Sequence, residues 1–193
     1  MNNQMIDIWN NIYSLLFTPK IFFENKKPDD LKAALPYFLA SVVISSIAIP
    51  FGGISSPSPS ISQSIISMYL ILFLFVIEVI FIYIIIRLLG EKTPFINIFI
   101  TLMFVRFISV MVAIISNVFY LYVMTTQLDY YVSIFYFSTI VGPIFLIWKS
   151  HCAIIGLSTM QKMNKRAATI GVLSVFSFFY LWNLFLRIYY FLP

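Results

Sequence analysis

Five long apolar runs fill most of this chain, and each is long enough to cross a lipid bilayer as a helix. The runs lie near residues 31–52, 64–89, 94–125, 130–149 and 168–191. Because a backbone in lipid must satisfy its own hydrogen bonds, we expect these runs to be helical. Of the 193 residues, 61% are hydrophobic and only 10% are charged, which excludes a soluble globular domain. The predicted fold class is therefore all-α, a polytopic membrane protein with five transmembrane helices.

The basic residues predict the orientation of the bundle, because Lys and Arg concentrate in cytoplasmic loops. With the connections numbered alternately, one side receives Lys20, Lys26, Lys27, Lys32, Arg87, Lys92, Lys149, Lys162, Lys165 and Arg166. Only Arg187 falls on the other side. This pattern predicts a multi-pass protein of the cell membrane with a cytoplasmic N-terminus and an external C-terminus. We assign the net charge of +5 to contacts with anionic lipid headgroups and expect no nucleic-acid partner.

Residues 1–30 precede the apolar runs and have the pattern of an interfacial amphipathic segment. Helical spacing places apolar side chains on one side of this segment, namely Met5, Ile6, Trp9, Ile12, Tyr13, Leu16 and Phe17. We expect a cytoplasmic interfacial segment over residues 1–30 and a transmembrane domain over residues 31–193. The side chains expected to anchor the chain in the interface are Trp9, Phe22, Phe23 and Trp148. The segment either senses membrane or docks a partner, or it is a passive anchor, which is the simpler interpretation.

Two charged residues fall inside the predicted spans. Glu78 lies twelve residues before Gly90, and Arg106 lies twelve residues after Pro94. At the rise of an α-helix, both lie about 18 Å from the turn that joins their spans. Because charges at this depth face the interior of a bundle and pair with one another, the sequence predicts a buried ion pair between Glu78 and Arg106.

A polar seam is predicted to extend outward from this pair. Ser67 lies on the helix face of Glu78, while Ser109 and Asn117 belong to the face of Arg106. The pair and its seam either fix the register of one helix hairpin, or form the outer half of a pathway for ions, protons or lipid headgroups. In the second interpretation Glu78 is the switchable group. We favour the first, because the inner half shows no matching polar run and isolated intramembrane pairs are often structural.

The remaining polar residues give little sign of catalysis. The sequence contains no HExxH, GxSxG or P-loop motif, and the lone Cys152 excludes an internal disulfide and a cysteine-based zinc site. His151 is the only histidine and is a candidate pH-sensitive group. We therefore expect a protein that is not an enzyme and has no catalytic residues, metal or cofactor.

Two short segments resemble a known family. Leu16-Phe-Thr-Pro19-Lys-Ile-Phe22-Phe23 looks like the Leu-x-x-Pro-x-x-Phe-Phe opening of the YIP1 family. The segment from Ile147-Trp148 through Gly156-Leu-Ser158 is similar to the end of that family's fourth span and the turn after it. The chain thus resembles a prokaryotic-type member. The resemblance implies five transmembrane helices and, in eukaryotes, roles in early secretory membranes with small GTPases and other family members as partners.

Two functions are compatible with these observations. The first is a non-enzymatic adaptor for membrane organisation or trafficking that binds partners, such as a small GTPase or other membrane proteins, at its cytoplasmic face. The alternative is a transporter, ion channel or lipid scramblase that uses the polar seam around Glu78 and Arg106. The sequence is also compatible with a homo-oligomer, since small residues allow close helix contact either within one bundle or between copies.

Overall fold

The structure is a computed structural model that describes residues 3–27, 29–51, 61–126 and 130–191. Within these ranges it contains helices and no strand, which confirms the predicted all-α class. The helices are α1 (Asn3–Phe17), α2 (Pro19–Glu24), α3 (Leu31–Phe51), α4 (Ile61–Leu88), α5 (Phe95–Arg106), α6 (Ile108–Thr126), α7 (Tyr130–Thr159) and α8 (Lys165–Phe191).

The helices have the length and surface of membrane spans. In the described ranges, four helical stretches are long and apolar enough to cross a bilayer: Ser64–Leu88, Phe95–Ile115, Thr139–Thr159 and Lys165–Phe185. Helix α3 adds a shorter apolar stretch, Leu31–Ser46. Large apolar side chains point outward, and Leu88 and Ile147 are 81% and 68% exposed. Helices that are apolar on every side are expected where lipid, not water, surrounds the bundle.

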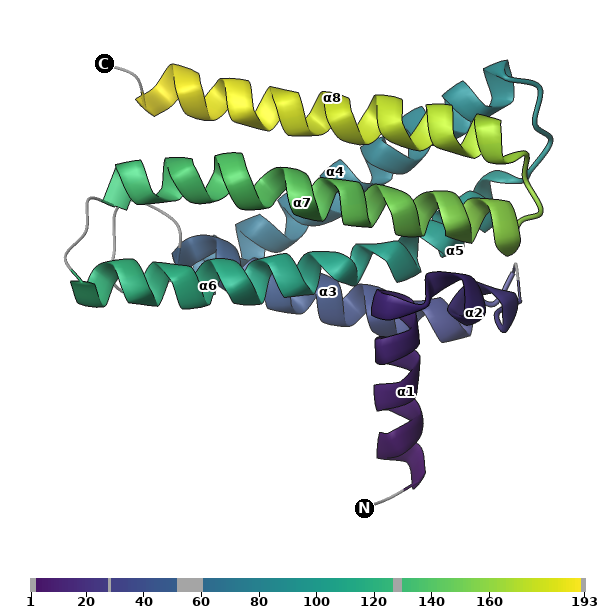
Figure 1. The fold of residues 1–193 in the computed structure, drawn as a ribbon, viewed down its shortest axis with the longest axis horizontal. Helices are drawn as coiled ribbons and strands as arrows, with labels where there is room; N and C mark the ends of the chain where they lie inside the picture. The colour runs from purple at the N-terminus through teal and green to yellow at the C-terminus, as the bar shows by residue number, and fades with distance from the viewer. Residues whose placement is uncertain (1–2, 28, 52–60, 127–129, 192–193) are drawn as a thin grey trace.

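Five of the helices form a closed ring. Helix α8 packs against α7 and α4, α3 packs against α4 and α6, and α6 completes the ring by packing against α7 (Figure 1). Helix α5 contacts α3, α7 and α4 and therefore occupies the interior of one half of the ring. The consequence is that α5 is protected from lipid along most of its length.

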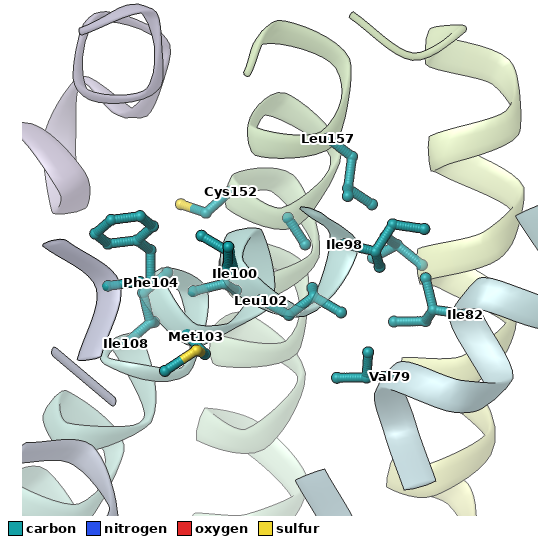
Figure 2. Close-up of a cluster of buried hydrophobic side chains, with 14 of the residues drawn as sticks. Val79, Ile82, Ile98, Ile100, Leu102, Met103, Phe104, Ile108, Cys152 and Leu157 are labelled. Carbon is teal, nitrogen blue, oxygen red and sulfur yellow. The ribbon is translucent and has the colours of Figure 1, made fainter. Parts of the chain in front are cut away.

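The core of the molecule is built around α5. Its buried side chains are Ile98, Ile100, Thr101, Leu102, Met103, Phe104 and Val105. Figure 2 shows this cluster meeting Val79 and Ile82 of α4 on one side and Cys152 and Leu157 of α7 on the other. Such interdigitation supplies the dispersion contacts that hold helices together where lipid removes the hydrophobic drive for association.

The third apolar run, which we expected as one span over residues 94–125, supplies one candidate span, Phe95–Ile115, but the helix is interrupted inside it. It is divided into α5 and α6 at Phe107. The Phe107 N–H donates to the Phe104 carbonyl oxygen at 3.1 Å, and the Val110 N–H donates to the Phe107 carbonyl oxygen at 2.9 Å, which is the tighter pattern of a 3₁₀ turn. The tightening lets the chain leave the interior, where α5 packs, and join the ring as α6.

The fourth run extends further than we expected. We expected this run to end near residue 149, but α7 is one helix from Tyr130 to Thr159. Residues just beyond the expected end are buried in the protein, since Ser150 is 2% exposed and Cys152 is fully buried. Helix α7 therefore carries Lys149 well inside the bundle.

The short helix α2 also differs from its expected setting. Pro19 begins this helix, a position that proline tolerates well. Phe22 and Phe23 were predicted to anchor the chain in the lipid interface, but both are buried in the protein. Their rings lie 5.3 and 6.2 Å from the ring of Phe104 in α5. These aromatic contacts attach α2 to the inside of the bundle, so the prediction of interfacial anchoring is wrong for these two residues.

The connections rich in basic residues gather at one end of the bundle. The links α2–α3, α4–α5 and α7–α8 lie together at the right of Figure 1. Two of them are joined directly, because the Asn164 N–H donates to Glu91 Oε1 at 3.1 Å. Gln161 reinforces this junction by donating to the Asn97 carbonyl oxygen at 3.1 Å and to Thr101 Oγ1 at 3.0 Å. We call this end the basic end.

Candidate functional site: a charge cluster between the helices

The predicted partners Glu78 and Arg106 lie close together in the structure. Glu78 projects from α4 and Arg106 is the last residue of α5, and Arg106 Nη1 lies 3.8 Å from Glu78 Oε2. The side chains are 13% and 14% exposed, so both charges are largely removed from the surface. The separation is that of an ion pair and is longer than a hydrogen bond.

A third residue, Lys149 of α7, is the nearer partner of Glu78. Its Nζ lies 3.2 Å from Glu78 Oε2 and 3.5 Å from Oε1. The lysine side chain is 17% exposed. We define Glu78, Arg106 and Lys149 as the charge cluster. It joins α4, α5 and α7 through one carboxylate.

Lys149 was not among the predicted site residues, because we assigned it to a basic loop. Its depth in the bundle becomes clear once the true end of α7 is known. Lys149 lies ten residues before Thr159, and Glu78 lies ten residues before Leu88, so both are about 15 Å from the basic end of their helices. Equal depth is also what identified Arg106 as a partner of Glu78.

Helix α8 covers the lysine with an aromatic ring. Lys149 Nζ lies 4.0 Å from the centroid of the Phe176 ring, a favourable cation–π distance. The buried face of α8 thereby contacts a cluster that contains two cations and one anion. Arg106 Nε is buried and has no hydrogen-bond partner among the described residues. The cluster therefore depends on a single carboxylate to balance two positive groups.

The predicted seam beyond the cluster is not formed as expected. Ser67 is half-buried on α4 and Ser109 is half-buried on α6. In the described part of the chain, α4 and α6 lie on different flanks of α3 and do not pack closely against each other. The side chain of Asn117 lies outside the described residues. Because α4 and α6 do not pack closely against each other, Ser67 and Ser109 are not brought together into one seam.

The other predicted residues are not members of the charge cluster. His151 is exposed on α7, and its ring centroid is 6.1 Å from that of the half-buried Trp148. Trp9 is 66% exposed on α1. Among the described residues, no group of three or more His, Cys, Asp and Glu side chains is arranged to hold a metal ion. The chemistry that the charge cluster presents is ion pairing between helices.

A second feature of the interior is the close packing of α2 on α7 at Gly156. Gly156 lies where a Cβ atom would be 2.7 Å from Thr101 Cγ2 and 2.9 Å from Phe23 Cζ. Next to it, Cys152 is buried with its Sγ 3.9 Å from the Leu15 carbonyl oxygen of α1. The absence of a side chain at residue 156 is what allows α2, α5 and α7 to meet.

This close approach gives a first prediction. Gly156→Ala is expected to destabilise the bundle by about 1–3 kcal/mol, because the added methyl overpacks a full interface. Thermal unfolding in detergent micelles measures the change. Thr101→Ser removes Cγ2 but keeps the hydroxyl, so adding it to Gly156→Ala should recover part of the loss. Equal stability of Gly156→Ala and the original protein would contradict the packing described here.

Fold and cluster together define a class, a polytopic α-helical membrane protein with a buried charge cluster between its spans. A family model described as the Yip1 domain matches residues 13–186. The chain therefore belongs to the YIP1 family. No curated protein and no solved structure was found to match the chain.

Proposed function

We propose that this protein is a non-enzymatic membrane-organising adaptor of the YIP1 family whose basic end binds partners from the cytoplasm. The observation that carries the proposal is that the charged groups of the cluster pair with one another inside the protein. The Glu78 carboxylate is shared by Arg106 and Lys149, and Phe176 covers the lysine. A carboxylate that is paired with two cations, one of them covered by an aromatic ring, is suited to joining helices and poorly suited to passing a solute.

In this proposal the basic end is the surface of the adaptor that binds partners. The hydrogen bonds of Asn164 with Glu91, and of Gln161 with Asn97 and Thr101, hold two connections in a fixed arrangement. Exposed cations surround this arrangement, including Lys92, Lys162, Lys165 and Arg166. Family membership makes small GTPases and other membrane proteins the partner classes to test first. The excess of basic residues at this end supports an orientation with the N-terminus in the cytoplasm.

One observation favours a second function, a transporter, ion channel or lipid scramblase. The helix is interrupted at Phe107, directly after Arg106, and the Arg106 Nε atom has no partner among the described residues. Interrupted helices that carry charges at membrane depth are common at transport sites.

Reconstitution into liposomes separates the two functions. Ion flux and lipid scrambling are measured over a range of pH and salt for the original protein and for Glu78→Gln. The adaptor proposal expects both proteins to behave like empty vesicles. Flux or scrambling by the original protein that disappears in a folded Glu78→Gln variant would refute the proposal and establish the second function.

A further inference from the structure

Helix α1 carries a stripe of exposed aromatic side chains that do not pack against the bundle. Trp9, Tyr13 and Phe17 are 66%, 61% and 62% exposed, and their spacing of four residues places them on one side of the helix. The Tyr13 and Phe17 ring centroids are 4.9 Å apart. The packing of α1 uses a different side, where Leu15 and Leu16 are buried. We call Trp9, Tyr13 and Phe17 the aromatic stripe.

The direction of α1 is that of a helix lying in the plane of a membrane. Figure 1 shows α1 running crosswise to α6, α7 and α8 and extending away from the bundle. Among the side chains of α1 whose burial the structure describes, Leu15 and Leu16 near its C-terminus are buried, and Ile12 packs against the same core. If the ring of helices crosses a bilayer, α1 must run along that bilayer.

The depth of α1 can be obtained from its contact with α7. Leu15 touches Cys152, which lies seven residues before the end of α7, and hence about 10 Å from that end. The 30 residues of α7 are about 45 Å long, whereas the hydrocarbon core is about 30 Å thick. A centred α7 would extend about 7 Å beyond the hydrocarbon on each side. The attached end of α1 therefore lies at the boundary between hydrocarbon and headgroups.

The charges near α1 are complementary to an anionic membrane surface. The polar side of the helix carries Asn11, whose Oδ1 accepts a bond from Lys26 Nζ at 3.5 Å. This contact turns the polar side towards the α2–α3 link, where Lys27 is exposed, and Lys32 is exposed at the start of α3. Cations beside an interfacial helix attract acidic phospholipids to the membrane surface next to it.

We infer that α1 binds the lipid surface of the leaflet at the basic end, with the aromatic stripe among the acyl chains and the neighbouring lysines at acidic headgroups. Crosswise direction, boundary depth and cationic surroundings agree on lipid as the occupant of the stripe. The inference adds a lipid partner to the proposed adaptor role. It can fail independently of that role, because its readout comes from α1 and not from flux or partner binding.

Fluorescence of Trp9 tests the inference in the full chain. A variant with Trp148→Phe and Trp182→Phe retains Trp9 as its only indole and is reconstituted into vesicles of phosphatidylcholine and phosphatidylglycerol. Lipids brominated near the headgroup should quench Trp9 about twofold more strongly than lipids brominated near the chain end, since interfacial helices are buried about 5–10 Å deep. Aqueous acrylamide should quench it weakly.

A matched variant moves the indole to the polar side of α1 by adding Trp9→Phe and Asp7→Trp, since Asp7 is exposed and lies on the side of the helix opposite Trp9. Its fluorescence should respond to acrylamide and little to brominated lipid. Strong acrylamide quenching of Trp9 would overturn the inference. A Trp9 protected from both quenchers would also overturn it, because the stripe would then be covered by a second copy of the chain.

Discussion

Glu78→Gln is expected to lower the free energy of unfolding by about 3–5 kcal/mol, the loss typical of a buried ion pair deprived of one partner. The substitution leaves Arg106 and Lys149 facing each other without the carboxylate that now lies 3.8 and 3.2 Å from them. Both cations are largely buried, so solvent provides little compensation. Unfolding by an anionic detergent in mixed micelles, followed by circular dichroism, measures the loss.

The two cations provide matched controls for this prediction. Arg106→Gln and Lys149→Met each leave one carboxylate facing one cation, which balances the charge of the cluster. Each is therefore expected to cost less than Glu78→Gln, although each also removes one partner. A Lys149→Met variant that is less stable than Glu78→Gln would show that packing on Phe176, and not charge balance, dominates at this site.

Phe23→Ala is the second substitution with a large expected effect. Phe23 is fully buried against Phe22, Phe104 and the open position at Gly156, so its removal leaves a cavity. Truncation of a buried phenylalanine costs about 3–5 kcal/mol. The unfolding assay used for Glu78 measures the loss, and Ile21→Ala is the control, because Ile21 belongs to the same helix but is 55% exposed.

A second readout distinguishes local detachment of α2 from global unfolding. Cys152 is buried beside the Leu15 carbonyl oxygen, so loosening of α1 and α2 exposes its thiol. Phe23→Ala should accelerate the reaction of Cys152 with a maleimide under conditions where the bundle stays folded. If the Phe23→Ala and Ile21→Ala variants react at the same rate, α2 is not held by Phe23.

The parts of the fold that depend on hydrophobicity could be predicted from the sequence. A run of apolar residues specifies a helix in lipid whatever its neighbours are, and α3, α4 and α8 begin and end within a few residues of the predicted runs. The connection at Gly90 has a φ of +88°, a conformation that suits glycine, and it gave a fixed point from which depth could be counted. That count placed Glu78 and Arg106 at the same depth.

The features that depend on packing between distant segments could not be predicted. No proline or glycine marks the break at Phe107, which arises from the passage of the chain out of the interior. Phe22 and Phe23 follow a lysine and have the composition of an interfacial anchor, yet the space beside Gly156 admits Phe23 into the bundle. Lys149 was assigned to a loop because a single sequence does not show that its ammonium group will meet the buried carboxylate of Glu78.

The central claim is that Glu78 and Lys149 interact as charges inside the bundle, and a double-mutant cycle tests it most directly. The free energy of unfolding is measured for the original protein, Glu78→Gln, Lys149→Met and the variant with both substitutions. We predict that adding Lys149→Met to Glu78→Gln restores much of the lost stability, because it removes one of two uncompensated cations. If the two losses simply add, the residues do not interact and the charge cluster does not hold the helices together.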